Sequence, residues 1–183
     1  MKKKFITFLS ALGLSACIGA GDNSPVVSRG PDNFPAMKGI DLTGEERPIP
    51  QSLEGDLNII TVAFEREQQS NVDTWIPYAE QIIAEHSYIR FYEIPLIYEM
   101  NMVMRGWVNN GMRSGIEDEK ARERTITVYT DRDDFFEMMD MRRDTIYTLL
   151  LDGDGKILWR ESGDASEKKI ESLKTVINRY KRS

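Results

Sequence analysis

Short runs of β-branched and aliphatic residues alternate along this chain with amphipathic helical stripes. Asn58 to Phe64 predicts a buried strand, and Ser70 to Asp73 has the form of a capping box that opens a helix. Tyr88 to Leu96 predicts the next strand, so this half forms a right-handed βαβ crossover with a parallel strand pair. The apolar stripe of the helix consists of Val72, Trp75, Ile76, Ala79, Ile82 and Ile83.

The second half of the chain predicts antiparallel strands and a closing helix. Strands are expected at residues 125–130, 145–151 and 156–161, with a helix at 133–141. The glycines of Asp152 to Gly155 make a hairpin turn between the last two strands. Upstream, residues 40–49 predict a leading hairpin, with Pro48 and Pro50 marking a sheet edge. For the closing helix, the expected cap is Asp164 with Glu167, and the expected stripe is Ile170, Leu173, Val176, Ile177 and Tyr180.

The N-terminus has the pattern of a bacterial lipoprotein export signal. Three lysines precede a short apolar run that ends at Leu14-Ser15-Ala16-Cys17, and the run is too short to span a bilayer. We expect residues 1–16 to be a signal peptide and Cys17 to be the lipid attachment site, carrying palmitate-type acyl chains. Residues 17–36 would be the lipid anchor and a flexible linker, and 37–183 one domain with an insert at about 97–123. The residue after the cysteine is Ile18 and not the aspartate that is associated with retention in the inner membrane. This favours the outer membrane as the location, with a domain that faces the periplasm.

Composition and charge restrict the function further. Hydrophobic residues make up 40% and charged residues 30% of the chain, as in an ordinary globular domain. The formal net charge of -6 is repelled by phosphate backbones, which argues against nucleic-acid binding. Cys17 is the single cysteine, so the predicted domain has no thiol and no disulfide framework.

The order of elements resembles that of the thioredoxin-like superfamily. Pro77 interrupts the first helix as the kinking proline does after a thioredoxin CxxC, which places the CxxC positions at Gln69-Ser70-Asn71-Val72. Tyr147 stands where these proteins have a cis-proline, and a trans peptide is expected before it because a cis bond to a non-proline residue costs about 3–4 kcal/mol. The resemblance implies an α/β, thioredoxin-like fold, with a central mixed sheet flanked by helices and a helical insert.

A narrower resemblance is to cysteine-less relatives similar to the mitochondrial assembly factor for the membrane sector of ATP synthase. Phe64, Trp75-Ile76-Pro77 and the hairpin from Leu151 to Gly155 carry it. It implies a non-catalytic binding, scaffolding or assembly role in the cell envelope, with an envelope protein as partner. Thiol-disulfide oxidoreductase and peroxidase activities are not expected, because both need a cysteine thiolate.

The loop from Glu65 to Ser70 is the first candidate site, since loops at this end of α/β sheets bind ligands. In this interpretation Arg66, Gln68, Gln69 and Tyr147 form a recognition patch at the degenerate active-site position. The alternative is a solvated loop with a helix cap.

The insert is the second candidate site because it combines methionines with a tryptophan. Met100, Met104 and Trp107 fall on one helical face, which favours either a helix packed on the core or a partner-binding surface. Met100, Met102 and Met104 also permit the alternative of a methionine-based copper-binding protein of the periplasm, because thioether sulfur suits Cu(I).

Other metal and catalytic chemistry lacks support in the sequence. His86 is the sole histidine and is expected to cap the first helix rather than act as a catalyst. Zinc sites lack ligands, and Asp152 to Gly155 lacks the further oxygen ligands of a calcium loop. We therefore expect no resident metal or cofactor.

Overall fold

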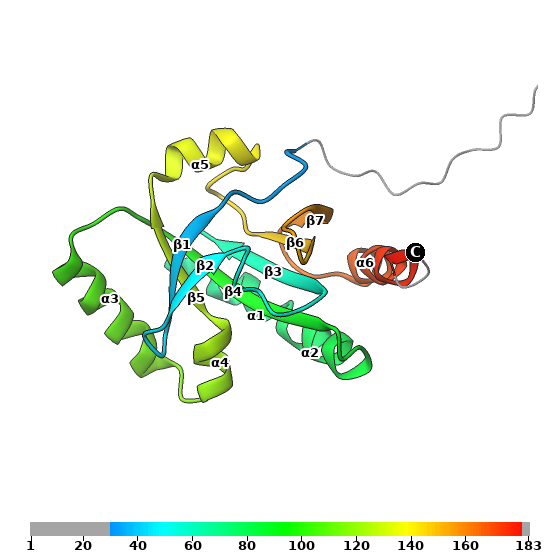
Figure 1. Ribbon diagram of the computed structural model, residues 1–183, viewed down its shortest axis with the longest axis horizontal. Coiled ribbons are helices and arrows are strands. Elements are labelled where there is room, and N and C mark those ends of the chain that lie inside the picture. Colours follow the sequence, from blue (N-terminus) through cyan, green and yellow to red (C-terminus); the bar gives the residue numbers. More distant parts are fainter. Residues whose placement is uncertain (1–29, 181–183) are drawn as a thin grey trace, which may run out of the picture.

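A mixed seven-stranded sheet forms the centre of the computed structural model, which describes residues 30–180 (Figure 1). The order across the sheet is β2-β1-β5-β4-β3-β6-β7. The strands are β1 (Met37–Asp41), β2 (Glu46–Ile49), β3 (Leu57–Ala63), β4 (Ile89–Tyr98), β5 (Ile126–Thr130), β6 (Tyr147–Asp152) and β7 (Ile157–Ser162). The predicted strands and the leading hairpin are confirmed, and β2 with its Pro48 lies at an edge.

The three central strands run parallel and the outer ones antiparallel. β4 pairs in parallel with β3 and with β5, whereas β6 pairs antiparallel with β3 and β7. The parallel pair arises because α2 returns the chain across the sheet between β3 and β4. The predicted mixed sheet of a thioredoxin-like fold is therefore confirmed.

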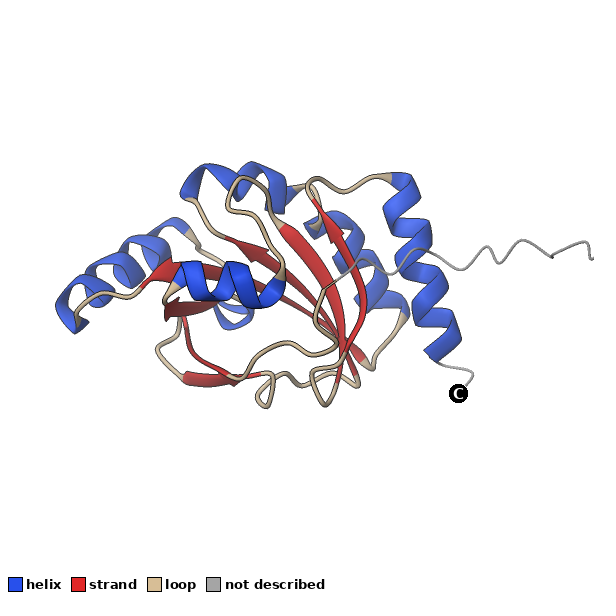
Figure 2. Ribbon diagram, turned by 90° about the horizontal axis from the view of Figure 1, so that it is seen from above, coloured by secondary structure: helices blue, strands red, loops and turns tan. Residues whose placement is uncertain are grey.

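Helices lie on both faces of the sheet and bury a separate apolar layer on each (Figure 2). One layer holds Trp75, Ile82, Trp159 and Leu173 beneath α1, α2 and α6, and the other holds Phe64 and Phe135 beneath α5. The helical elements are η1 (Arg66–Gln68), α1 (Gln69–Asp73), α2 (Ile76–Glu85), α3 (Met102–Gly115), α4 (Glu119–Arg124), α5 (Arg132–Met139) and α6 (Glu167–Tyr180).

The first helix is interrupted near Pro77, as expected, and it begins before residue 70. The chain forms η1 and α1 without interruption, turns at Thr74 and Trp75, and starts again as α2. Pro77 has no N–H to donate to the carbonyl of Asp73, so a continuous α-helix cannot form there. Ser70 lies inside α1 and caps nothing, so the predicted capping box is wrong.

Two further expectations need correction at α6. The carboxylate of Asp164 accepts a hydrogen bond from Asn71 Nδ2 at 2.6 Å, and the helix begins only at Glu167, so Asp164 ties α1 to the α6 loop. Tyr180 is 38% exposed and does not belong to the buried stripe.

The packed part of the domain starts slightly before residue 37. Phe34 is buried, its N–H donates to the carbonyl of Gly155 at 2.9 Å, and Ile157 N–H donates to the carbonyl of Asp32 at 2.8 Å. The predicted signal peptide, Cys17 and most of the linker lie outside the described residues.

The hairpin between β6 and β7 has the geometry that its glycines predict. Gly155 has a positive φ of 85°, and the carboxylate of Asp152 accepts hydrogen bonds from the N–H groups of Asp154 and Lys156. A Cβ at Gly155 would lie 2.4 Å from Cγ of Pro50, so this turn also fits against the β2 edge.

We predict that Gly155→Ala lowers the free energy of unfolding by at least about 2 kcal/mol, because it combines an unfavourable φ with a steric clash. Gly153→Ala is the matched control, since the atom nearest to its added Cβ is 3.9 Å away. Urea unfolding of both variants measures the difference. Equal stability losses would show that the turn tolerates a side chain at Gly155.

Candidate functional site

Gln68 fixes the loop that follows β3. Its Oε1 accepts hydrogen bonds from the N–H groups of Phe64 at 2.8 Å and Glu65 at 3.2 Å, and its Nε2 donates to the carbonyl of Arg143 at 2.8 Å. The side chain is buried and its polar atoms are occupied within the fold. Gln68 therefore holds the loop in position and is not exposed for recognition.

Glu65 joins this loop to the start of α5 and to the α5–β6 loop. Its Oε1 accepts from Arg132 Nη2 at 2.8 Å and also from Arg143 Nε, and the Arg132 guanidinium lies 4.2 Å from the ring centre of Tyr98. The hydrogen bond from Arg132, followed by that from Arg143, outweighs the opposing effect of burial and lowers the pKa of Glu65. The carboxyl ends of β3, β4 and β5 are thus joined around one carboxylate.

Tyr147 has a structural role as well. Its ring is buried with the Arg160 guanidinium 4.8 Å from the ring centre, and its hydroxyl accepts a hydrogen bond from Arg142 N–H at 3.0 Å. Among the described residues only the bond from Ile49 to Pro50 is cis, so the peptide before Tyr147 is trans, as predicted.

A groove of about 1120 Å³ lies between the β3–α1 loop, β4 and the insert. From the degenerate active-site loop it is lined by Arg66, Gln69 and Val72, and from the insert by Trp107 and Met112. Gln69 and Val72 are the residues that the resemblance to thioredoxin assigns to the CxxC positions. The structure therefore brings Arg66, Gln69 and Trp107 of the predicted site residues to one groove, whereas Gln68, Tyr147, Met100 and Met104 are not among its lining.

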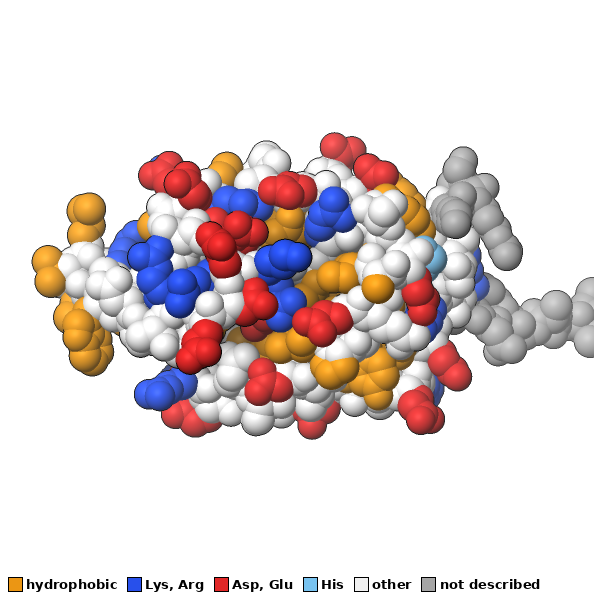
Figure 3. All heavy atoms as spheres, turned by 90° about the horizontal axis from the view of Figure 1, so that it is seen from below, with side chains coloured by type: hydrophobic (Ala, Val, Ile, Leu, Met, Phe, Trp, Pro, Cys, Tyr) orange, Lys and Arg blue, Asp and Glu red, His pale blue; other side chains and the backbone are white. Residues whose placement is uncertain are grey.

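The helix α3 exposes its apolar residues rather than packing them on the core. Met102, Val103 and Trp107 are 86%, 83% and 76% exposed, and α3 contains no buried residue. In the space-filling view, hydrophobic side chains protrude at the end of the molecule that α3 forms (Figure 3). Of the two alternatives for the insert, the helix packed on the core is therefore wrong.

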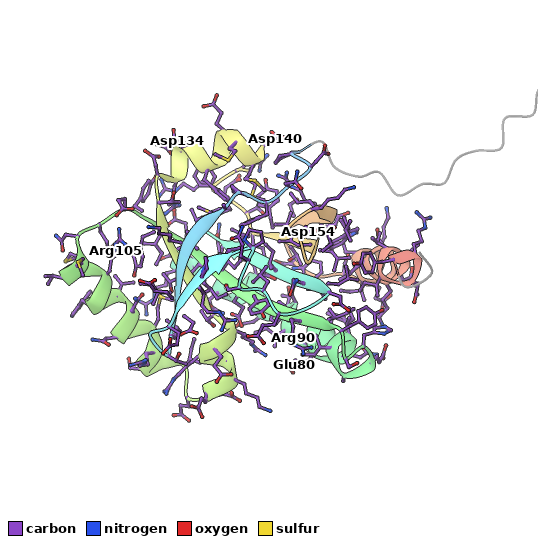
Figure 4. All side chains as sticks on the ribbon, in the orientation of Figure 1. Glu80, Arg90, Arg105, Asp134, Asp140 and Asp154 are labelled. Carbon is purple, nitrogen blue, oxygen red and sulfur yellow. The ribbon has the colours of Figure 1, made fainter. Side chains whose placement is uncertain are left out.

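Polar contacts hold α3 in place instead. Arg105, which is labelled on α3 in Figure 4, pairs with Glu99, and its guanidinium lies 4.8 Å from the ring centre of Tyr129. The hydroxyl of Tyr129 donates to Asn109 Oδ1 at 2.7 Å, and Arg113 Nε donates to the carbonyl of Leu42 at 2.6 Å. These contacts fix the helix without covering its apolar residues.

The helix does not gather the methionines expected for copper. Met102 and Met104 are two residues apart on α3, and side chains at that spacing point away from each other. Met100 precedes the helix, whose cap is Asn101. Within residues 30–180, no group of three or more histidine, cysteine, aspartate and glutamate side chains is arranged to hold a metal ion.

Glu93 is a groove residue that the sequence reasoning missed. It lies on β4, is 9% exposed, and its Oε1 is 3.3 Å from Nε of Arg124 at the end of α4. Burial raises the pKa of Glu93, against the opposing effect of Arg124. Its signal in the sequence is the charged residue at a position where the alternation of strand 88–96 calls for an apolar one.

The remaining predicted residue is placed as expected. His86 is the C-terminal cap residue of α2, and its ring centre lies 5.6 Å from that of Tyr88.

Among the helices of the described part, none is long and apolar enough to cross a bilayer.

Solved structures share the fold at low sequence identity. The exposed lipoprotein thioredoxin Etrx1 of Streptococcus pneumoniae matches with a TM-score of 0.50 and 12% identity, over 79% of this chain and 99% of its own. BsSco, of the Sco family of cytochrome c oxidase assembly proteins, matches with a TM-score of 0.52 and 12% identity, over 79% of this chain and 92% of its own. Yeast Sco1 with copper bound matches with a TM-score of 0.51 and 13% identity, over 81% of this chain and 92% of its own. The chain therefore has a thioredoxin-like fold.

The family model of the ATP10 protein matches residues 32–179, which is most of the chain. The chain belongs to this family of ATP synthase assembly factors, so the resemblance drawn from Phe64, Trp75 and the β6–β7 hairpin is confirmed. No curated protein matches it.

We predict that Glu65→Gln lowers the free energy of unfolding by about 2 kcal/mol at neutral pH, because it leaves the buried Arg132 guanidinium without its carboxylate. The pKa of Glu65 is lower in the folded chain, so its contribution is complete above the unfolded-state pKa and is lost as the pH falls through the folded-state value. The deficit of the variant should therefore disappear in acid.

Urea unfolding of the parent and the variant at neutral and acidic pH measures this difference. The control is Glu67→Gln, which changes an exposed neighbour and should leave the free energy of unfolding within about 0.5 kcal/mol of the parent value. A deficit that is equal at both pH values would contradict the assignment.

Proposed function

We propose that this protein is a non-catalytic binding and assembly module of the bacterial cell envelope. The observation that carries the proposal is the exposed apolar surface of α3, formed by Met102, Val103 and Trp107. Large exposed apolar residues on one element mark interaction sites, and methionine and tryptophan are enriched at protein interfaces. Membership of an assembly-factor family supports the same conclusion.

The active-site position supports binding rather than redox catalysis. Disulfide exchange begins with a thiolate, and the CxxC positions hold Gln69 and Val72. The sole cysteine of the sequence, Cys17, precedes the described domain. The hydrogen bonds of Gln68 and the ion pairs of Glu65 hold the loop in a fixed conformation, which suits a preformed binding surface.

The proposed location rests on the N-terminal sequence. Leu14-Ser15-Ala16-Cys17 after a basic and apolar segment favours lipid attachment at Cys17 and a domain that faces the periplasm, with the outer membrane favoured by Ile18. A lipid-anchored domain would meet its protein partner at the membrane surface, held there by the chain between Cys17 and Asp32.

We expect a photo-crosslinking amino acid in place of Trp107 to capture one envelope protein reproducibly in native membranes. The same amino acid in place of Tyr180, which is 38% exposed on α6, is the matched control and should capture none. Adding Val103→Ser to the Trp107 probe should abolish capture, because it removes apolar contact area from the same helix. Capture that is equal from both sites, or that is insensitive to Val103, would contradict the proposal.

We also predict that Cys17→Ser moves the protein from the membrane fraction to the soluble fraction, because it removes the acceptor of the lipid. Fractionation and mass spectrometry of the mature N-terminus measure the change, with Ser15→Ala as a control that keeps both the cysteine and a small residue before it. A parent protein that carries no acyl chains would rule out the anchor.

A further inference from the structure

The sheet face beneath the groove is polar, unlike the rest of that face. Thr61 pairs with Glu93 between β3 and β4, and Glu93 bridges to Thr125 beside β5. All three line the groove. Where α2 and α6 cover the same face, the corresponding strand positions carry apolar residues such as Ile59 and Phe91. A buried carboxylate therefore stands where packing alone would favour a hydrophobic side chain.

The positive charge around Glu93 is incomplete. Arg124 approaches Glu93 with Nε and Glu80 with Nη1, each at 3.3 Å, so one guanidinium serves two carboxylates (Figure 4 labels Glu80 on α2). Burial is the main cause of the raised pKa of Glu93, and the negative charge of Asp73 on α1 acts in the same direction. The side-chain hydrogen bond of Gln69 lowers this pKa but brings no positive charge. The guanidinium of Arg124 is thus shared by two carboxylates, and a third, that of Asp73, acts on Glu93 from α1.

The charges on the rim do not complete this balance. Glu65 is already engaged by Arg132 and Arg143, and Asp118 caps α4 by accepting from Ala121 N–H. Arg66 also lines the groove, but it is exposed to water, where its charge is screened, as the charges of the exposed Glu80 and Asp73 are. Glu93 is the buried carboxylate of the groove, and Arg124, which pairs with it, also pairs with Glu80. The buried end of the groove therefore attracts a further cation.

The size and walls of the groove indicate what would carry that cation. Its volume of about 1120 Å³ exceeds that of a usual small-molecule pocket. The walls include Val72, Ile76, Pro95, Val108 and Met112, so most of an occupant's surface must be apolar. A peptide segment with apolar side chains and one long basic side chain meets both requirements.

We propose that the groove between α1, β4 and the insert binds an apolar segment of a partner protein whose lysine or arginine side chain pairs with the carboxylate of Glu93. This inference rests on the proposed function, because it specifies the chemistry of the partner of a binding module. The long stem of the basic residue would lie against the apolar walls while its charged end reaches the carboxylate. Glu93 is then the specificity-determining residue, and Gln69 of the degenerate active site borders the same contact.

The test uses labelled peptides of alanine and leucine that carry one central guest residue. The guests are lysine, arginine, norleucine as the uncharged match for lysine, and glutamate, and binding to the full chain is followed by fluorescence anisotropy. We expect the lysine and arginine peptides to bind at least about tenfold more tightly than the norleucine peptide, because a charge-assisted hydrogen bond forms in a buried site. In Glu93→Gln the four peptides should bind alike.

Glu93→Gln is suited to this comparison of peptides because it removes the charge of Glu93 with little change in shape. Since burial raises the pKa of Glu93, the folded chain disfavours its charged form. An amide oxygen at this position can still accept from Arg124 Nε, and Arg124 keeps Glu80 as an ion-pair partner, so Glu93→Gln is expected to cost little stability at neutral pH. Glu85→Gln is the matched control, because Glu85 is an exposed residue of α2 that bonds only to Gln81 in the described contacts. It should retain the full preference for lysine.

Protonation gives a second measurement. The preference for lysine should weaken as the pH falls through the raised pKa of Glu93, while binding of the norleucine peptide stays unchanged in that range. Glu80, Asp73 and Arg124 also face Glu93, so Glu93→Gln must remove this pH dependence for it to be assigned to Glu93.

Several outcomes would overturn the inference. These are equal binding of lysine and norleucine peptides to the parent, no binding of any basic peptide, or a lysine preference that survives Glu93→Gln. Dimerisation that excludes the peptides would assign the groove to a second copy of this chain. If the Trp107 probe captures an envelope protein equally well in Glu93→Gln, the proposed function stands and only this inference fails.

Discussion

The arrangement of the insert depends on the contacts that the guanidinium of Arg124 makes with the rest of the domain. This guanidinium closes α4 against the sheet through Glu93, against α2 through Glu80, and lies 5.4 Å from the ring centre of Phe91. Because this contact and those of Tyr129 and Arg113 are polar, the insert is fixed to the core without burying its own apolar residues. Both the groove beneath the insert and the exposed surface of α3 follow from that single fact.

Much of the fold could be predicted from the sequence because its strands and helices have clear periods. The runs at residues 58–64 and 88–96 are apolar enough to require burial, and the Asp152 to Gly155 turn admits little besides a hairpin. The break between α1 and α2 was indicated only by Pro77, because the apolar stripe continues across it through Trp75. A stripe reports which residues face the core, whereas the proline at position 77 decides whether the backbone between them stays helical.

The candidate site could be predicted only in part, since a residue type does not state whether its side chain faces water. Gln68 and Tyr147 are polar residues in the expected region, yet the side chain of each forms hydrogen bonds with backbone groups inside the fold. Trp107 has the opposite outcome, because a residue that usually packs in a core is exposed here. The place of Glu93 in the groove followed only from the strand register, which pairs it with Thr61 on the face of the sheet that lines the groove.

The loss of the thiols changes what the loop after β3 must do. A redox site needs a reactive sulfur that an opposing disulfide can reach, and therefore a loop whose end is open to solvent. In this chain the loop is instead fixed by the side chain of Gln68 and by the pairing of Glu65 with Arg132, at the same edge where the groove opens. A rigid loop loses little conformational entropy on binding, so a loop held in this way suits the proposed contact surface. The loop, the sheet edge and the insert are held side by side by hydrogen bonds and ion pairs such as those of Gln68, Glu65 and Arg124, and none of these contacts involves a thiol.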